Sequence, residues 1–196
     1  MTSNAHTERT DRPPTVMPTA AGEATAGSAS QAAPLVDTRR VQGRRKLRFA
    51  NFDEVVADAR QVHQRGYRPL GNWSLGQTLK HLGLAMHASV EGGTFSVPWW
   101  LKVVGRTLLR PYMLHLSFPA GFRLPRRAAQ RLVPNETSYE EGLATLQSGI
   151  ERLASDTQRG SHPVIGRLSV ADWNRFHLRH AEMHLSFFVP PDSASD

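Results

Sequence analysis

The sequence contains no cysteine among its 196 residues. This absence excludes a disulfide framework, thiolate metal ligands and a cysteine nucleophile, so any metal ion must be held by nitrogen and oxygen atoms. Long apolar runs are also missing: no 18 consecutive apolar residues occur, and we expect no transmembrane helix. Lysine is scarce, with 3 residues against 21 arginines, and the net charge is +7. The arginines are dispersed and no recognition motif accompanies them, which argues against nucleic-acid binding.

The first 40 residues have almost no large apolar side chains and consist mainly of Thr, Ala, Ser, Pro and Gly. A segment of this composition cannot bury enough apolar surface to fold, so we expect a disordered tail over residues 1–40. Arginine pairs at 39–40 and 44–45 are not followed by the apolar core of an export signal, because charged residues such as Lys46 and Arg48 interrupt it. We therefore interpret the protein as cytoplasmic.

Residues 44–190 contain four segments in which apolar side chains recur with the period of an α-helix. The segments begin near Asn51, Ser74, Thr137 and Ser169, each with an acidic or amide residue three positions later. No segment shows a strand pattern. The sequence therefore predicts one all-α domain over residues 44–190, an up-and-down four-helix bundle whose long crossover carries an additional helix starting at Pro98.

The predicted crossover helix combines two tryptophans, Trp99 and Trp100, with a basic stripe. The stripe consists of Lys102, Arg106 and Arg110. Pro111 should end or kink this helix. A basic helix with tryptophans at its start can lie on a membrane surface. We favour the plainer interpretation, in which the basic stripe faces water and the helix covers the bundle.

The last predicted helix, residues 169–188, carries His177, His180 and His184 on one face. Two helical ligands of one ion need Cβ atoms about 5–6 Å apart, which spacings of three or four residues supply. His177 and His184 lie two turns apart, about 10.5 Å along the axis, so one ion cannot take all three. His180 and His184 form the better pair, with the HxxxH spacing of helical zinc sites. Without a third ligand, core histidines satisfied by hydrogen bonds would be the preferred interpretation.

His81 lies beside the apolar seam of the predicted second helix, residues 74–91. Its own side of that helix carries the small residues Thr78, Ala85 and Ala88. Small neighbours leave an imidazole room to reach an adjacent helix, as a ligand at a helix interface must do. A core histidine is the alternative interpretation here too.

Four stretches of the sequence resemble the DinB-like (DinB/YfiT) superfamily of bacterial metal-binding four-helix bundles, in particular a branch of unknown function. The stretches are NWSLGQTLKHLGLAMHASVEG, LLRPYMLHLSFPAGFRLP, SYEEGLATLQSGIERL and HPVIGRLSVADWNRFHLRHAEMHLSFFVP. In that superfamily a divalent ion is held by one histidine of the second helix and an HxxxH pair of the last helix. The resemblance therefore implies His81, His180 and His184 as metal ligands. Better-known members continue with Arg-Gly-Gln, where this chain has Leu185-Ser186-Phe187.

Three neutral imidazoles with an open fourth position are typical of a catalytic metal site. Imidazole suits several divalent ions, among which we expect zinc or nickel first. Some DinB-like proteins are thiol-dependent S-transferases, so the resemblance implies a metal-dependent enzyme that joins a low-molecular-weight thiol to a small-molecule substrate. A metal-dependent hydrolase is the second possibility.

For either reaction, His177 and Gln77 are the candidates for a proton relay or for a hydrogen-bond partner of a ligand. A rival hypothesis is a non-enzymatic helical module that has a structural metal or none and acts through a partner or its basic surface. A structural site would normally be closed by a fourth protein ligand, whereas an enzyme would leave that position open. A homodimer is compatible with either hypothesis.

Overall fold

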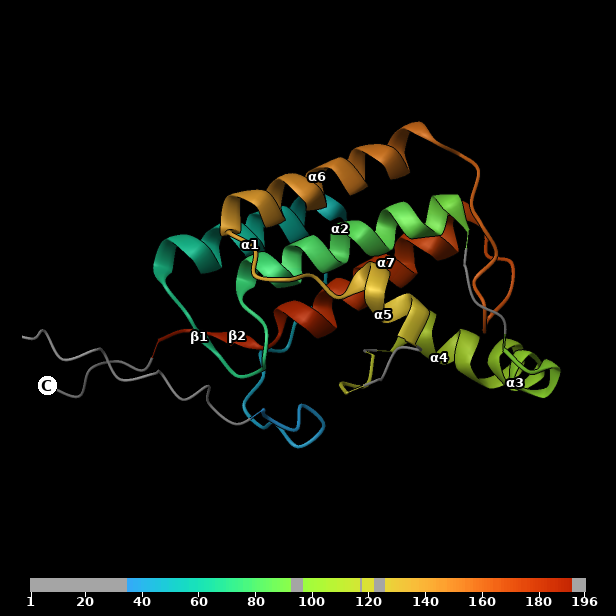
Figure 1. Cartoon of the computed structure of the whole chain (residues 1–196), viewed down its shortest axis with the longest axis horizontal. Coiled ribbons are helices and arrows are strands. Elements are labelled where there is room, and N and C mark those ends of the chain that lie inside the picture. Colours follow the sequence, from blue (N-terminus) through green and yellow to red (C-terminus); the bar gives the residue numbers. More distant parts are fainter. Residues whose placement is uncertain (1–34, 93–96, 117, 122–125, 192–196) are drawn as a thin grey trace, which may run out of the picture. The chain divides into compact units, whose positions relative to one another are not determined.

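The computed structural model describes residues 35–92, 97–116, 118–121 and 126–191. These residues are mostly helical, which confirms the all-α prediction. The long helices are α1 (Phe52–Arg65), α2 (Leu75–Glu91), α6 (Tyr139–Ser155) and α7 (Val170–Leu185). They run side by side in Figure 1. Residues 1–34 of the tail predicted to be disordered over residues 1–40 lie outside the described residues. Residues 35–40 are described and hydrogen-bonded: the Asn72 side chain binds both the N–H and the carbonyl oxygen of Val36.

The N-termini of the long helices are capped by side chains. Asn51, Ser74 and Ser169 each accept a hydrogen bond from the backbone N–H three residues on, as predicted. The remaining predicted start, Thr137, is wrong by one residue: Ser138 caps α6 and accepts the N–H of Glu141. Thr137 instead donates its hydroxyl to the carbonyl oxygen of Asn135. Both Thr137 and Ser138 have a glutamate three positions later, so the spacing alone could not separate them.

The main hydrophobic core lies among the four long helices. Its fully buried side chains include Val55, Leu75, Leu79, Leu82, Met86, Leu146, Leu185 and Phe188. A second cluster packs the crossover against the outer side of α7 and contains Leu114, Phe118, Ile165, Trp173 and Phe176. Because α7 contributes to both clusters, a residue on α7 can face either of two environments.

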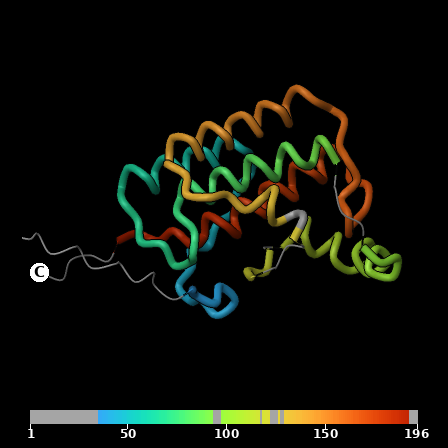
Figure 2. Tube along the Cα trace, in the orientation of Figure 1, coloured from blue at the N-terminus to red at the C-terminus, as the bar shows by residue number. Residues whose placement is uncertain are grey.

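Helices α2 and α6 pack closely along their whole length (Figure 2). Glycines spaced seven residues apart make this approach possible. They are Gly76 and Gly83 on α2, and Gly142 and Gly149 on α6. A Cβ atom at Gly83 would overlap the carbonyl oxygen of Thr145, and one at Gly142 would overlap that of Gly76. The backbones therefore lie closer than side chains would permit.

The crossover contains more helix than predicted. α3 (Trp99–Val104), the π-helical turn η1 (Gly105–Leu109) and α4 (Arg110–His115) follow one another without a break, and α5 (Arg126–Leu132) comes later. Pro111 does not end the helix, which continues through α4 to His115; the π-helical turn η1 directly precedes α4. Over the described stretches, none of the helices is long and apolar enough to cross a membrane.

Two short strands, β1 (Arg68–Pro69) and β2 (Phe188–Val189), form an antiparallel pair, with Arg68 opposite Val189. The expectation of no strands is therefore wrong. The pair arises where the chain leaves α7 and runs alongside the α1–α2 connection, and the Leu70 N–H extends it by donating to the carbonyl oxygen of Phe187 at 2.9 Å. Two residues are too short for an alternating pattern to register in the sequence.

Candidate metal centre

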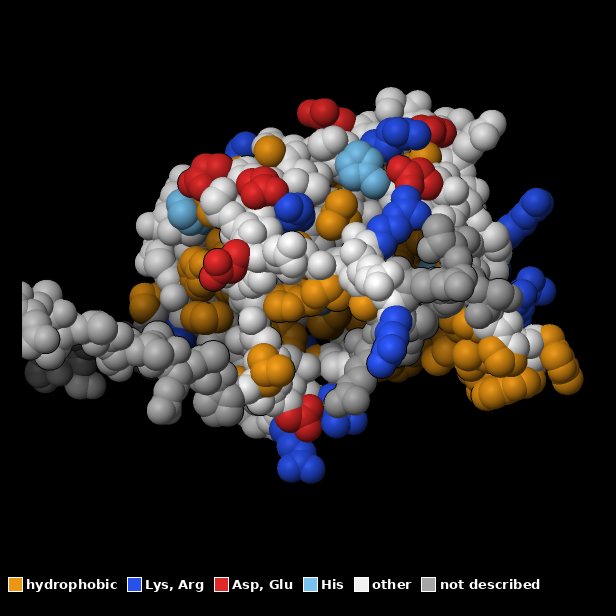
Figure 3. Space-filling view, viewed as in Figure 1, with side chains coloured by type: hydrophobic (Ala, Val, Ile, Leu, Met, Phe, Trp, Pro, Cys, Tyr) orange, Lys and Arg blue, Asp and Glu red, His pale blue; other side chains and the backbone are white. Residues whose placement is uncertain are grey.

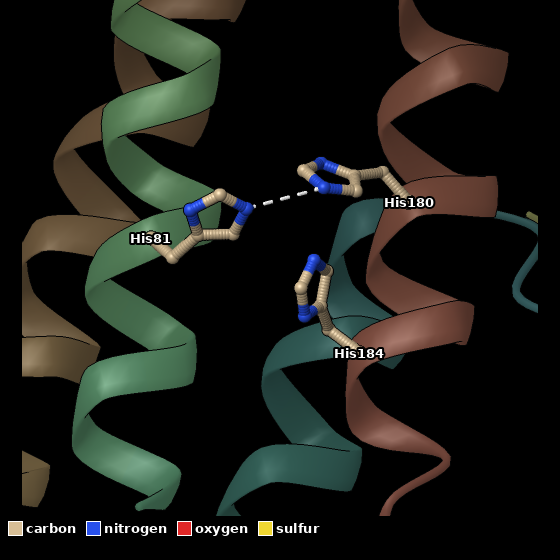
Figure 4. A group of neighbouring side chains, drawn as sticks. All are labelled: His81, His180 and His184. Atoms are coloured by element: carbon tan, nitrogen blue, oxygen red, sulfur yellow. Dashed lines mark hydrogen bonds between the residues drawn. The ribbon is translucent and has the colours of Figure 1, made fainter. Parts of the chain in front are cut away.

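His81 on α2 meets His180 and His184 on α7, and the three imidazoles point toward one another (Figure 4). One nitrogen from each ring lies within 4.8 Å of the others. The HxxxH spacing brings His180 and His184 to the same face of α7, and the packing of α2 against α7 supplies His81. The structure thus brings together the three residues that the resemblance implied.

The spacing of the nitrogens is compatible with one tetrahedral ion. Two nitrogens at the usual zinc distance of about 2.0–2.1 Å in tetrahedral geometry lie about 3.3 Å apart. The Nε2 atoms of His81 and His180 are 3.3 Å apart. The other nitrogen separations in the group are no larger than 4.8 Å. The group could therefore hold a metal ion.

A backbone carbonyl orients His81. Its Nδ1 lies 2.7 Å from the carbonyl oxygen of Leu132, at the end of α5, so Nδ1–H donates to that oxygen. In the neutral ring this tautomer leaves Nε2 unprotonated, with its lone pair directed toward His180. Histidine ligands of metals commonly donate their other N–H in this way, which fixes the ring and raises its basicity. The crossover therefore takes part in building the site.

Burial keeps the three imidazoles neutral. It lowers the pKa of His81 and lowers the pKa values of His180 and His184 well below their ordinary range. The positive charge that His184 or His81 would carry lowers the pKa of His180 further. His180 and His184 keep some contact with solvent although many protein atoms surround them. Neutral imidazole is the form that binds a metal ion, so the pKa values match that role.

Aromatic rings enclose the histidines. Trp73 stacks on His184 with ring centroids 5.5 Å apart and lies 4.9 Å from His81. Phe118 and Phe176 contact His180 at 5.6 and 6.2 Å. These contacts restrict ring rotation. Trp73 lies in one of the stretches that carry the resemblance, but the sequence analysis assigned it no role. No feature of the sequence indicated that Phe118 would contact the site.

The two predicted relay candidates have other partners. His177 Nε2 lies 3.0 Å from the Ser89 hydroxyl, and its ring stacks on Trp173. Its Nδ1 is buried and has no hydrogen-bond partner within the described structure. Gln77 accepts the Ser74 N–H in the capping box of α2. Neither side chain has a described hydrogen bond to a ligand histidine, and their proposed roles stay predictions.

Among the described residues, the group contains three histidines and no fourth histidine, aspartate or glutamate. With three protein ligands, a bound ion would keep a position for water or substrate. A cavity of about 360 Å³ is lined by Arg44, Lys46, Phe118, Met183 and Ser186 among others, and by none of the three histidines. Phe118 links the two, because its ring contacts both the cavity and His180.

The comparison with protein families gives one finding. A family model described as a protein of unknown function, DUF1569, matches residues 41–191. The match covers the described helices and all three histidines. Searches among curated proteins and solved structures give no match. The family description carries no activity, so functional arguments depend on the site itself.

Proposed function

The chain belongs to the DUF1569 family of unknown function, and we propose that it is a metal-dependent enzyme whose three-histidine site holds a catalytic divalent ion. The observation that carries this proposal is the convergence of three neutral imidazoles from two helices without a fourth protein ligand among the described residues. We further propose that the long helices form an up-and-down four-helix bundle of the DinB-like type, with the ligands on its second and last helices.

The chain's own residues would prepare the site. Leu132 holds His81 in the tautomer that presents Nε2, and Trp73 and Phe118 keep the rings in place while limiting access of water. When bound, a zinc or nickel ion would supply Lewis acidity that makes a thiol or a water molecule nucleophilic at neutral pH. A small-molecule substrate would approach from the side that the three ligands leave open.

Thiol-dependent S-transfer is the reaction class we place first, and hydrolysis second. The chain has no cysteine, so a thiol nucleophile must come from a low-molecular-weight compound. The cavity that Phe118 lines supports an acidic small molecule in this role, because Arg44, Arg45 and Lys46 line it against one acidic residue, Glu182. Its volume of about 360 Å³ is within the usual range for small-ligand sites.

The non-enzymatic alternative has one observation in its favour. The 3.3 Å between His81 Nε2 and His180 Nε2 is also a hydrogen-bond distance. One ring could donate to the other, and the histidines would then stabilise the contact between α2 and α7 without any ion. The two hypotheses differ in a measurable quantity, the metal content of the folded protein.

The deciding experiment is metal analysis by mass spectrometry on protein purified without a histidine tag. Wild type is compared with His81→Ala and His184→Ala, and His115→Ala serves as the control because this histidine is exposed on the crossover. We expect about one zinc or nickel ion per chain in wild type and in the control, and loss of the ion in both ligand variants. Wild-type protein that carries no ion and binds none on addition would contradict the proposal.

If the ion is present, thiol-transfer and hydrolytic substrates are screened with the loaded protein. His177→Ala then tests the relay hypothesis. Loss of turnover in a folded variant that keeps the metal supports the relay; some loss of stability is expected in either case, because His177 is fully buried. A fully active His177→Ala protein would remove this residue from the mechanism.

A further inference from the structure

The crossover helix exposes an unusual amount of apolar surface. Eight of the twelve exposed large hydrophobic residues in the described part of the chain lie between residues 99 and 116. They are Trp99, Trp100, Val103, Val104, Leu108, Leu109, Tyr112 and Leu116. In Figure 3 hydrophobic side chains gather over α3, at the lower right of the molecule. We expected this helix to cover the bundle and to face water only with its basic stripe. The exposed apolar side chains differ from that expectation.

The opposite side of the same helix is held firmly against the protein. Gly105 lies so close to the Val164 carbonyl that a Cβ atom there would overlap it. Leu114 is buried in the second hydrophobic cluster, and Arg110 forms a 3.0 Å ion pair with Asp172 of α7. The outward face is therefore presented by an anchored element. The burial of its inner face leaves the tryptophans outside: Trp99 is 77% and Trp100 is 55% exposed.

The charge of this region is of one sign. Residues 92–135 include no aspartate or glutamate. Within the helix Lys102 is half-buried, and Arg106 is exposed although its guanidinium lies beside Gly166. Exposed tryptophan beside lysine and arginine is the composition of helices that lie in the plane of a membrane, where the rings sit at headgroup level and the cations reach lipid phosphates. Two copies of this face would place cations against cations, so charge favours an anionic surface over self-association.

We propose that the face formed by α3, η1 and α4 docks the protein on an anionic lipid surface. This inference is independent of the metal site and of the reaction catalysed there. A bilayer also suits the shape of the patch, because a projecting helix face can enter a deformable interface without a matching groove. The orientation follows from the anchoring: the helix would lie along the surface, with the remaining helices on the aqueous side.

The test uses full-length protein and vesicles of either phosphatidylcholine alone or phosphatidylcholine with phosphatidylglycerol. We expect co-sedimentation with the anionic vesicles, a blue shift of tryptophan emission, and binding that weakens as salt is raised. Trp99→Ser/Trp100→Ser should weaken binding at least about tenfold. Lys102→Gln/Arg106→Gln should weaken it about 25-fold, since each cation near an anionic surface contributes about fivefold.

The matched control is Arg60→Gln/Arg65→Gln, which removes the same charge from exposed positions on α1. The proposal requires this variant to bind vesicles much more tightly than Lys102→Gln/Arg106→Gln does. Equal weakening would mean that net charge alone attracts the protein, and the docking face would be rejected. Absence of binding at low salt would also overturn the proposal. The proposal would also be overturned if the protein does not bind vesicles and instead forms a dimer that Trp99→Ser/Trp100→Ser dissociates.

Discussion

Arg179 and Glu182 form a buried ion pair one turn apart on α7, with Arg179 Nη2 2.7 Å from Glu182 Oε1. Both groups also bind the backbone of Phe49: the Phe49 N–H donates to Glu182, and Arg179 donates to the Phe49 carbonyl oxygen. The pair thus attaches the segment before α1 to the last helix. Glu182 Oε2 and Arg179 Nε are buried without a hydrogen-bond partner in the described structure, so the pair is only partly satisfied.

Removing one member of this pair should lower the stability of the protein by more than half of what removing both members does. We expect Glu182→Leu alone to lower the free energy of unfolding by about 3–5 kcal/mol, because it leaves the buried Arg179 charge unpaired. Arg179→Met should cost less, because Glu182 keeps an ion pair with Arg48 at 3.9 Å. The double variant should lose less than the sum of the two. Urea denaturation of all three variants measures these values. Lys80→Met is the control, since its pair with Glu141 is partly exposed and should contribute about 1 kcal/mol or less.

Because glycines allow α2 and α6 to lie in close contact, replacing one of them with alanine should change stability in the direction opposite to the usual one. Gly→Ala inside a helix ordinarily stabilises a protein by about 0.5–1 kcal/mol. At Gly83 the added methyl would overlap the Thr145 carbonyl and push the helices apart, so we expect destabilisation by several kcal/mol. Gly149→Ala should be milder, because the methyl would lie 3.0 Å from the Gly83 carbonyl oxygen. Thermal unfolding of both variants gives the comparison. A more stable Gly83→Ala protein would refute the close contact.

Acid should destabilise the protein in the range where histidine normally titrates. Burial lowers the pKa of His162 to about 4 and that of His177 to about 3, against about 6.5 in an unfolded chain. Below pH 6.5 these two histidines take up protons in the unfolded chain but stay neutral in the folded chain. Stability that is fully present above pH 6.5 is therefore lost as the pH falls, by about 1.4 kcal/mol per pH unit for each such residue.

The three ligand histidines add to this loss, because burial lowers their pKa values too. Glu182 acts in the opposite direction, since burial raises its pKa. Urea denaturation of the metal-free protein at pH 7.5, 6.5, 5.5 and 5.0 measures the balance. We expect a steep decline below pH 6.5, and a shallower one in His177→Leu. A flat profile over this range would mean that the histidines are not held neutral by burial.

The features that sequence reasoning predicted well are local. Caps at Asn51, Ser74 and Ser169 depend on residues three positions apart, and the pairing of His180 with His184 depends on one helical turn. That His81 would join the pair is a matter of packing between helices. The sequence around His81 showed only that its small neighbours left the imidazole room. The resemblance was needed to place His81 with His180 and His184.

Other features had a signal that was not used, or no signal. The seven-residue spacing of Gly76 and Gly83, repeated at Gly142 and Gly149, stands in the sequence and indicates a close helix contact. The carbonyl of Leu132 that orients His81 could not be predicted, because every residue has a carbonyl and only the path of the crossover brings this one near. The exposed apolar face of α3 likewise depends on which side of the helix docks.

Trp73 provides an optical test of where a metal ion binds. Its ring lies 4.9 Å from His81 and 5.5 Å from His184, so an ion held by these histidines would be near the indole. Nickel and copper ions quench indole fluorescence at such short range, and we expect their addition to quench part of the emission of the four tryptophans. Trp73→Phe should abolish most of the quenching, whereas Trp173→Phe, in the second hydrophobic cluster, should preserve it. If Trp73→Phe is quenched as strongly as wild type, the ion binds elsewhere on the chain, and the three histidines lose their role as its ligands.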